Sequence, residues 1–84
     1  MKWEVVVEKR AAKRLQRFPE SDRKRVAAAL IEMEDGPFSG DIVKLKGTAG
    51  FRRRVGAYRI LFDLNLEARR VEVTDIARRT STTY

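Results

Sequence analysis

The sequence predicts an α+β fold in which an N-terminal strand and a helical hairpin precede a three-stranded antiparallel meander. Three observations lead to this prediction. Apolar residues alternate near the N-terminus, recur at helical spacing over residues 9–35, and alternate again after residue 51. A helical hairpin placed between strands in this way packs on a sheet, so we expect a small sheet with the helices on one face. A chain of 84 residues holds one modest core, which predicts a single domain over residues 1–84.

The N-terminal strand and the first helix follow from two different spacings. Trp3, Val5 and Val7 alternate with charged residues, which is the period of a half-buried strand. From Lys9 to Phe18 the apolar positions recur every three or four residues, as in a short amphipathic helix. The rest of this helix is strongly basic: Lys9, Arg10, Lys13, Arg14 and Arg17. We interpret this basic side as solvated, with a patch for RNA or an acidic partner as the open alternative.

The second helix is predicted between Pro19 and Asp35. Pro19 ends the first helix, and the segment Glu20-Ser21-Asp22 supplies acids for the first turn and a possible cap. The pair Gly36-Pro37 is typical of a helix end with the glycine at C′. The two helices therefore form a hairpin.

The segment from Pro37 to Gly50 shows no clear period and is rich in glycine, so we predict a loop. Three apolar residues within it, Ile42, Val43 and Leu45, are expected to attach this loop to the core.

A β-hairpin is predicted from two strands, Phe51–Val55 and Tyr58–Leu64, joined by Gly56-Ala57. A glycine at the first central position of a two-residue turn suits type II′. That turn pairs Val55 with Tyr58 and Arg54 with Arg59. Alternation then divides the side chains into two faces. The first face holds Arg52, Arg54, Arg59 and Leu61. The second, predicted to be core, holds Phe51, Arg53, Val55, Tyr58, Ile60 and Phe62.

The last strand is predicted over Arg70–Ile76, after a turn at Asn65–Ala68. Strict alternation puts Val71 and Val73 on one face and Glu72, Thr74 and Ile76 on the other.

Composition favours a polyanionic partner. The formal net charge is +7, the isoelectric point is near 10.4, and arginine outnumbers lysine 13 to 6. There is no cysteine and no histidine, which excludes a disulfide framework, a thiolate zinc site and a cysteine nucleophile. We predict no metal and no cofactor. No apolar run approaches the ~20 residues that span a bilayer, so we expect a cytoplasmic protein with no membrane contact.

The four arginines of the hairpin are the strongest functional signal. Like charges directly opposite in a sheet are unfavourable, so the Arg54–Arg59 pair requires an anion or a well-solvated surface. Phosphate is the obvious anion, and a wet sheet face is the alternative. Because Arg53 falls on the predicted core face, we expect its guanidinium to reach water past an open strand end.

Three segments of the sequence resemble one known family. They are Lys44-Leu45-Lys46-Gly47, the hairpin from Phe51 to Phe62, and Ile76-Ala77-Arg78-Arg79 with the later Tyr84. The chain resembles the RelE/ParE toxin superfamily of toxin-antitoxin modules over nearly its full length, and its RelE branch most closely.

The resemblance implies an endoribonuclease that cleaves mRNA in the ribosomal A site, without metal, by attack of a 2′-OH on the adjacent phosphate. The family's catalytic positions fall here on Arg52, Arg54, Arg59, Arg79 and Tyr84. The family's RNA contacts are expected at Lys44, Lys46 and Arg78. Arg78 is also the alternative to Arg79 as the catalytic basic residue after the last strand. Since arginine keeps its proton, Tyr84 is the candidate general base, and stacking on a base to orient the 2′-OH is its alternative role.

The resemblance also implies partners and a rival function. The implied partners are a cognate antitoxin protein, in a hetero-oligomer, together with mRNA and the ribosomal RNA. The rival is a ParE-like toxin that inhibits DNA gyrase without ribonuclease activity. A non-catalytic RNA-binding module is the third interpretation, which the placement of the hairpin aromatics on the core face disfavours.

Overall fold

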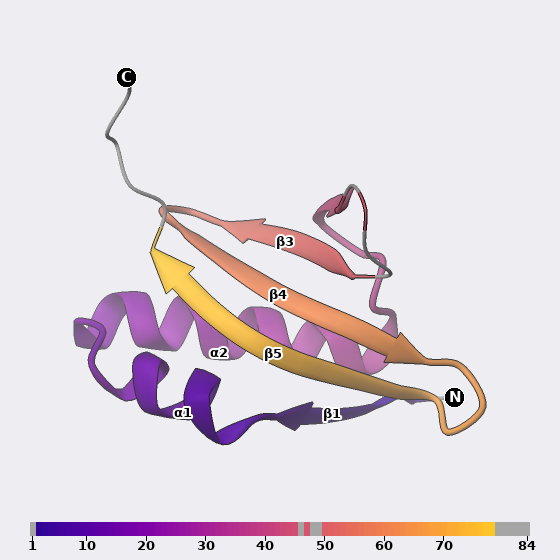
Figure 1. Cartoon of the computed structure of the whole chain (residues 1–84). Helices are drawn as coiled ribbons and strands as arrows, with labels where there is room; N and C mark the ends of the chain where they lie inside the picture. Colours follow the sequence, from indigo (N-terminus) through magenta and orange to yellow (C-terminus); the bar gives the residue numbers. More distant parts are fainter. Residues whose placement is uncertain (1, 46, 48–49, 79–84) are drawn as a thin grey trace.

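The computed structural model describes residues 2–45, 47 and 50–78. Over these residues the chain forms seven elements: β1 (Glu4–Val7), α1 (Lys9–Gln16), α2 (Glu20–Asp35), β2 (Asp41–Lys44), β3 (Phe51–Val55), β4 (Tyr58–Asn65) and β5 (Arg70–Arg78). The sheet order is β1-β5-β4-β3-β2, with β1 parallel to β5 and the other neighbours antiparallel. Figure 1 shows α2 running behind the sheet and α1 beside β1 and β5. The predicted α+β class is confirmed, and the predicted elements occur in the predicted order, with β2 as an additional strand.

One hydrophobic core joins the two helices to one face of the sheet. The helices contribute Ala11, Val26, Ala29 and Met33, each at most 4% exposed. The sheet contributes Tyr58, Ile60, Phe62, Val71, Val73 and Ile76. Because all these strand residues share one face, the opposite face of β3 and β4 carries no helix and is left for polar side chains.

The segment Asp41–Lys44 is a strand, and its prediction as part of a loop was wrong. It pairs antiparallel with β3 and forms one edge of the sheet. Ile42 packs against the core, as expected, while the next residue, Val43, lies opposite Arg52 on the other face. With only two apolar residues between two charged ones, the strand shows no alternation long enough to recognise.

The face predicted for Ile76 was also wrong. Ile76 is fully buried together with Val71 and Val73. The pairing of β4 with β5 shifts register, because Leu61 lies opposite Asp75 whereas Phe62 lies opposite Val73. Thr74 is the extra residue of this bulge, and an extra residue reverses the alternation that follows it. The strand also continues past the predicted end to Arg78.

The helix ends differ in detail from the prediction. Helix α1 stops at Gln16, two residues before the expected end. Glu20 and Asp22 lie in the first turn of α2 as expected, but no side chain caps that turn. Gly36 closes α2 with an extended backbone, φ −174°, and not with the left-handed C′ conformation that glycine usually supplies.

The hairpin of β3 and β4 has the predicted register: Val55 lies opposite Tyr58 and Arg54 opposite Arg59. Gly56 has φ +57°, whereas Ala57 has no positive φ. A positive φ at the first central residue alone distinguishes type II′ from type I′, as predicted. In the described part of the chain, no helix is both long and apolar enough to cross a membrane.

Candidate nucleic-acid interface

Three of the four hairpin arginines lie on the face of the sheet that carries no helix. Arg54 is directly opposite Arg59, and Arg52 is opposite Leu61. Their neighbours in the strands, Arg53 and Tyr58, point the other way and are buried. The predicted grouping of Arg52, Arg54 and Arg59 is therefore confirmed as geometry. We call these three residues the arginine cluster.

Arg54 is held by a carboxylate from the edge strand. Its Nε and Nη2 atoms donate to the two oxygens of Asp41 at 3.0 and 3.1 Å. Asp41 lies directly opposite Arg54 in the β2–β3 ladder. This bidentate pair is half-exposed, with side-chain exposures of 39% for Arg54 and 52% for Asp41. Asp41 was not predicted, and only recognition of β2 as a strand would have revealed it.

Arg52 and Arg59 have no acidic partner among the described residues. Arg52 lies between Val43 and Leu61 on neighbouring strands, and its Nε atom is buried without a described hydrogen-bond partner. Arg59 is half-buried and lies between Arg54 and Ala77. The cluster therefore combines three guanidinium groups with one carboxylate. Arginine presents donors in a planar fork that matches the oxygens of a phosphate.

Arg53 is a core residue, and it does not reach water as expected. It is 7% exposed and points toward α2. Its Nη1 donates to the carbonyl oxygen of Ala29 at 3.2 Å, and its Nη2 pairs with Glu32 at 2.5 Å. The guanidinium also lies against Gly40, where a Cβ atom would come within 2.9 Å of it. The predicted face was correct, and the escape to solvent was wrong because α2 supplies an ion-pair partner.

Lys44 and Arg78 lie apart from the arginine cluster. Lys44 is opposite Phe51, and Arg78 is opposite Tyr58, so both positions belong to the face that the helices cover. Arg78 is nevertheless exposed, at the end of β5. Their expected contacts with RNA stay predictions. The other predicted residues, Lys46, Arg79 and Tyr84, lie outside the described residues.

Tyr58 has a structural role beneath the hairpin. Its hydroxyl donates to Asp22 at 2.9 Å, and its ring lies 4.3 Å from that of Phe18. Burial, and then the hydrogen bond and negative charge of Asp22, raise the pKa of Tyr58 above its usual 10.0, while Arg78 opposes this shift. The phenol therefore holds its proton, and its hydrogen bond ties the hairpin to the first turn of α2.

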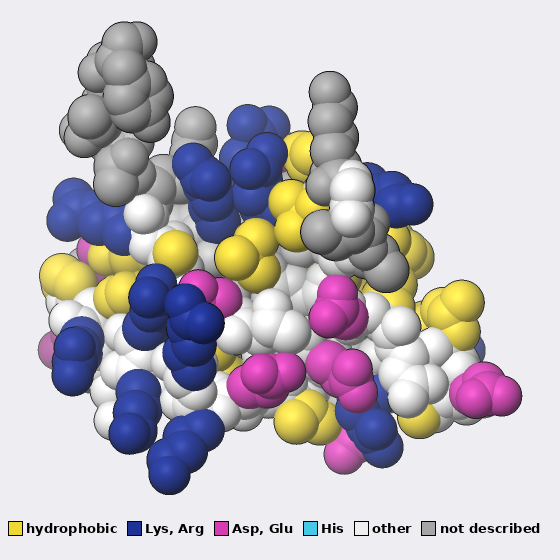
Figure 2. Space-filling model, viewed as in Figure 1, with side chains coloured by type: hydrophobic (Ala, Val, Ile, Leu, Met, Phe, Trp, Pro, Cys, Tyr) yellow, Lys and Arg dark blue, Asp and Glu magenta, His cyan; other side chains and the backbone are white. Residues whose placement is uncertain are grey.

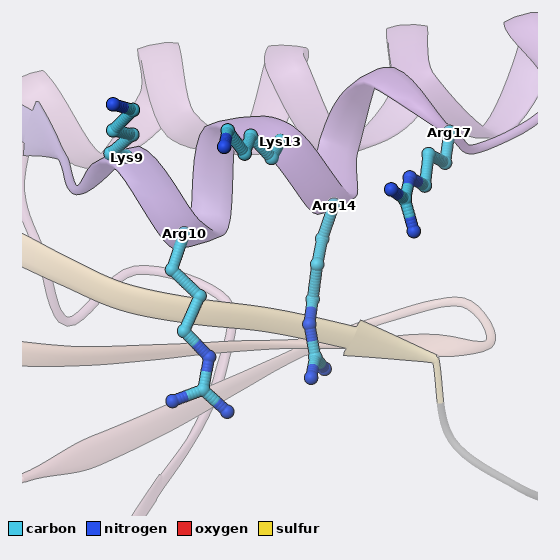
Figure 3. Close-up of a pocket in the computed structure, with 5 residues that line it drawn as sticks. All are labelled: Lys9, Arg10, Lys13, Arg14 and Arg17. Carbon is cyan, nitrogen blue, oxygen red and sulfur yellow. The ribbon is translucent and has the colours of Figure 1, made fainter.

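A second concentration of positive charge lies on α1 and on Arg17, the residue that follows it. Lys9, Arg10, Lys13, Arg14 and Arg17 line an open hollow of about 580 Å³ (Figure 3), and all five are exposed. We call these five residues the α1 basic face. Figure 2 shows Lys and Arg side chains gathered over α1 and along the β3 side of the sheet. The acidic side chains of this view gather mainly over β1 and the neighbouring part of β5.

Metal binding finds no support in the described part of the chain. No three acidic side chains there lie close enough together to hold an ion.

The comparisons with known proteins agree on the fold. No family model matches the sequence, and no curated protein matches it either. Among solved structures, the chain is similar to one in the archaeal RelE–RelB complex from Pyrococcus horikoshii OT3. The two share 25% identity with a TM-score of 0.84, covering 98% of this chain and 100% of the other.

Two further structures extend this likeness. A RelB–RelE antitoxin–toxin complex from Methanococcus jannaschii has a chain 26% identical, with a TM-score of 0.72, covering 87% of this chain and 88% of that one. A YoeB/ParE toxin from Agrobacterium tumefaciens is 18% identical with a TM-score of 0.76, covering 92% and 99% of the two chains. The last of these likenesses concerns the fold alone.

Proposed function

Because this chain belongs by its fold to the RelE/ParE toxin superfamily, we propose that it is the toxin of a type II toxin-antitoxin pair. Its activity in this proposal is that of an mRNA interferase: it enters the ribosomal A site and cuts mRNA there, which stops translation in the cytoplasm.

The proposed chemistry uses only the RNA and the side chains of this chain. The ribose 2′-oxygen attacks the adjacent phosphorus, and the bond from phosphorus to the 5′-oxygen breaks. Negative charge rises on the non-bridging oxygens during this step. Arg52 and Arg54 would hold the phosphate, and Arg59 would stabilise the developing charge. No metal is needed, since three guanidinium groups supply the positive charge.

Residues outside the arginine cluster are proposed to carry out the proton transfer. Arginine keeps its proton at neutral pH, so none of the three arginines serves as the general base. Tyr84, in its phenolate form, is proposed to take the proton of the 2′-OH, and Arg79, or Arg78 in its place, to assist the departing 5′-oxygen. Tyr84 and Arg79 lie outside the described residues, so these two roles stay predictions.

One observation carries the proposal: Arg54 and Arg59 lie directly opposite each other on a face without a covering helix. Such a like-charge pair is unfavourable by about 0.2–1 kcal/mol in a sheet unless an anion offsets it. Asp41 offsets part of it through Arg54. Arg52 and Arg59 are left without an acidic partner in the described chain, as expected of a surface that receives a phosphate.

The decisive test is Arg59→Ala. Loss of one charged donor aimed at the transition state should slow mRNA cleavage about 10²- to 10³-fold. The measurement is cleavage of ribosome-bound mRNA by the purified chain, together with mapping of mRNA 5′ ends after induction in cells. Lys24→Ala is the matched control and should leave cleavage unchanged, because Lys24 is 75% exposed on α2 and pairs with Glu20 alone among the described residues. Intact mRNA after induction of a growth-arresting wild-type chain would refute the ribonuclease proposal.

A cognate antitoxin is the second part of the proposal. The structural neighbours from Pyrococcus and Methanococcus are RelE–RelB complexes. A partner with acidic or amphipathic segments would neutralise this chain's net charge of +7 and form a toxin-antitoxin hetero-oligomer with it.

Inhibition of DNA gyrase is the alternative function, which the similarity to a YoeB/ParE toxin keeps in consideration. Under this alternative, induction of the chain causes gyrase-dependent DNA breaks while mRNA stays intact. Arg59→Ala would then be as toxic as the wild type.

A further inference from the structure

Asp41 is the carboxylate that pairs with the arginine cluster among the described residues, and the cleavage chemistry proposed above does not use it. It lies on the edge strand β2, directly opposite Arg54. Its two oxygens accept from Arg54 Nε and Nη2 at 3.0 and 3.1 Å. A carboxylate at this place repels any phosphate that the cluster receives, because both are anions. What Asp41 does for Arg54 must therefore offset that repulsion.

Asp41 leaves one complete edge of the Arg54 guanidinium free. A guanidinium is planar and carries five N–H donors in a fixed fork. Asp41 occupies the side edge, which Nε and Nη2 form. The end edge, formed by Nη1 and the second hydrogen of Nη2, has no acceptor among the described residues. Two parallel N–H donors on one edge are what bidentate binding of a phosphate requires. Arg54 can therefore bind Asp41 and a phosphate at the same time.

Fold stability does not explain the pair of Arg54 and Asp41. The two side chains are 39% and 52% exposed, and ion pairs this exposed add little to stability. The pair instead restricts a long side chain that would otherwise sample several rotamers. It also offsets part of the repulsion between Arg54 and Arg59, which lie directly opposite each other. Its main effect is to hold one cation in a fixed direction beside a second.

We propose that Asp41 is a positioning residue for the cleavage step. It fixes Arg54 through the side edge of the guanidinium, so that the end edge is free for the scissile phosphate, and it stays bound to Arg54 while the phosphate is held. This inference rests on the proposed function, because it takes an RNA phosphate as the substrate. Orientation ahead of the reaction raises the rate of the chemical step, whereas the charge of the carboxylate weakens the binding of RNA. Asp41 therefore has opposite effects on rate and on affinity.

The kinetic test is Asp41→Asn, which keeps the size of the side chain and removes its charge. Single-turnover cleavage of ribosome-bound mRNA over a range of chain concentrations gives the maximal rate and the half-saturating concentration separately. The maximal rate should fall about 10- to 100-fold, the effect of a small misplacement of a group that holds the substrate. The half-saturating concentration should stay the same or fall.

Two kinetic results would overturn the positioning role. A slower rate accompanied by a higher half-saturating concentration would show that Asp41 merely supports the fold. A rate equal to or above that of the wild type would show that Asp41 does nothing for cleavage or opposes it.

The matched control is Glu4→Gln, which removes one negative charge from the other edge strand. Glu4 also accepts from an arginine of the neighbouring strand, Arg70 Nε, at 3.1 Å. Two strands separate β1 from β3, about 14 Å at the usual spacing between strands. Because salt screens charges over such a distance, cleavage by Glu4→Gln should match the wild type within about threefold. Equal losses in Asp41→Asn and Glu4→Gln would reduce the effect to net charge.

A second substitution, Arg54→Gln, shows whether Asp41 acts through Arg54. In this background, adding Asp41→Asn should change the maximal rate by less than about twofold, because the group that Asp41 orients is already absent. A further loss as large as in the wild-type background would mean that Asp41 acts elsewhere, contrary to the proposal.

Inorganic phosphate tests the geometry without cleavage. The signal is the Nε–H resonance of Arg54 in nitrogen-15 NMR spectra of the full chain, assigned by its absence from Arg54→Gln. This hydrogen should exchange with water more slowly in the wild type than in Asp41→Asn, because Asp41 accepts it. On titration with phosphate, the Nη resonances should shift while Nε–H keeps its slow exchange. Faster exchange at saturating phosphate would mean that phosphate displaces Asp41, and unshifted Nη resonances would mean that the end edge receives no phosphate. Either result would overturn the proposal.

The positioning role and the nuclease function fail in different ways. A chain that cuts no mRNA, but whose Arg54 binds phosphate while Asp41 stays in place, refutes only the nuclease function. A chain that cuts mRNA as fast with Asn at position 41 as with Asp refutes only the positioning role.

Discussion

Among the described residues, Arg53 is the buried cation, and its ion-pair partner Glu32 lies 21 residues earlier, on α2. The guanidinium joins β3 to α2 through the carbonyl of Ala29 and the carboxylate of Glu32. A buried charge is costly to leave unpaired, so Glu32 has a structural role even though its own side chain is 63% exposed.

We expect Glu32→Ala to lower the free energy of unfolding by about 1–3 kcal/mol, because it strips a buried cation of its charged acceptor. The loss of unfolding free energy should fall in the lower part of this range, because water can reach the Arg53 guanidinium from the exposed site that the Glu32 side chain leaves. Glu34→Ala, two residues further along α2, is the control and should change stability by less than about 0.5 kcal/mol. Urea denaturation measures both. Equal values for the two variants would mean that the ion pair contributes nothing.

Tyr58 makes stability sensitive to alkaline pH. Its folded-state pKa is raised above 10.0 by burial and by Asp22, so the protonated phenol favours the folded chain. This contribution is complete below pH 10 and is lost as pH rises through the folded-state pKa. As pH rises above about 10, the wild type should therefore lose stability more steeply than Tyr58→Phe. Parallel curves from denaturant unfolding would contradict the assignment.

At the scale of elements, the turn between α2 and β2 depends on one glycine. Gly40 has φ +87°, and a Cβ atom there would lie 2.9 Å from Arg53 Nε and Nη2. The residue therefore lets the chain turn into β2 and leaves room for the buried guanidinium. Through β2, it also sets the position of Asp41 beside the arginine cluster.

Two other glycines allow the cost of the backbone conformation to be distinguished from the cost of the clash with Arg53. Gly47 shares a positive φ of 75°, but a Cβ atom added there would meet no atom of the described residues within 4 Å, and Gly36 has neither constraint. We expect Gly36→Ala to be neutral or stabilising by up to about 1 kcal/mol. Gly47→Ala should cost about 1–2 kcal/mol for its backbone alone. Gly40→Ala should cost clearly more than Gly47→Ala, because Arg53 must also move. Thermal unfolding of the three variants gives the order, and equal costs at positions 40 and 47 would exclude the clash.

The elements also show which predictions the sequence could support. The β3–β4 register follows from one local turn and from alternation around it, so it could be predicted together with the shared face of the arginine cluster. Strand β2 could not be predicted from the sequence, because its four residues are recognisable as a strand only by their pairing with β3. The acidic partner Asp41 was missed for the same reason. Ile76 was misplaced because the bulge at Thr74 leaves no mark in the sequence pattern.

At the scale of the whole molecule, the net charge of +7 penalises the compact state, and specific anions should relieve that penalty. We expect inorganic phosphate to raise the melting temperature more than chloride does at equal ionic strength. A bound anion that stabilises the folded chain by about 1 kcal/mol should raise the melting temperature by about 4–8 °C for a domain of this size. Differential scanning calorimetry measures the difference between the two salts.

The arginine cluster is the proposed origin of this difference. Arg54→Gln/Arg59→Gln should show a smaller difference between phosphate and chloride than the wild type, because only the general stabilisation by phosphate remains. A difference as large as in the wild type would exclude the arginine cluster as the anion site.

The order of the strands has a consequence for the protein when no partner covers it. The longest strands, β4 and β5, lie inside the sheet, while both edges are strands of four residues, β1 and β2. The charged side chains of Glu4, Asp41 and Lys44 are exposed on these edges. Short, charged edges offer little unpaired backbone to a second molecule. A free chain is therefore not expected to join its sheet to that of another copy.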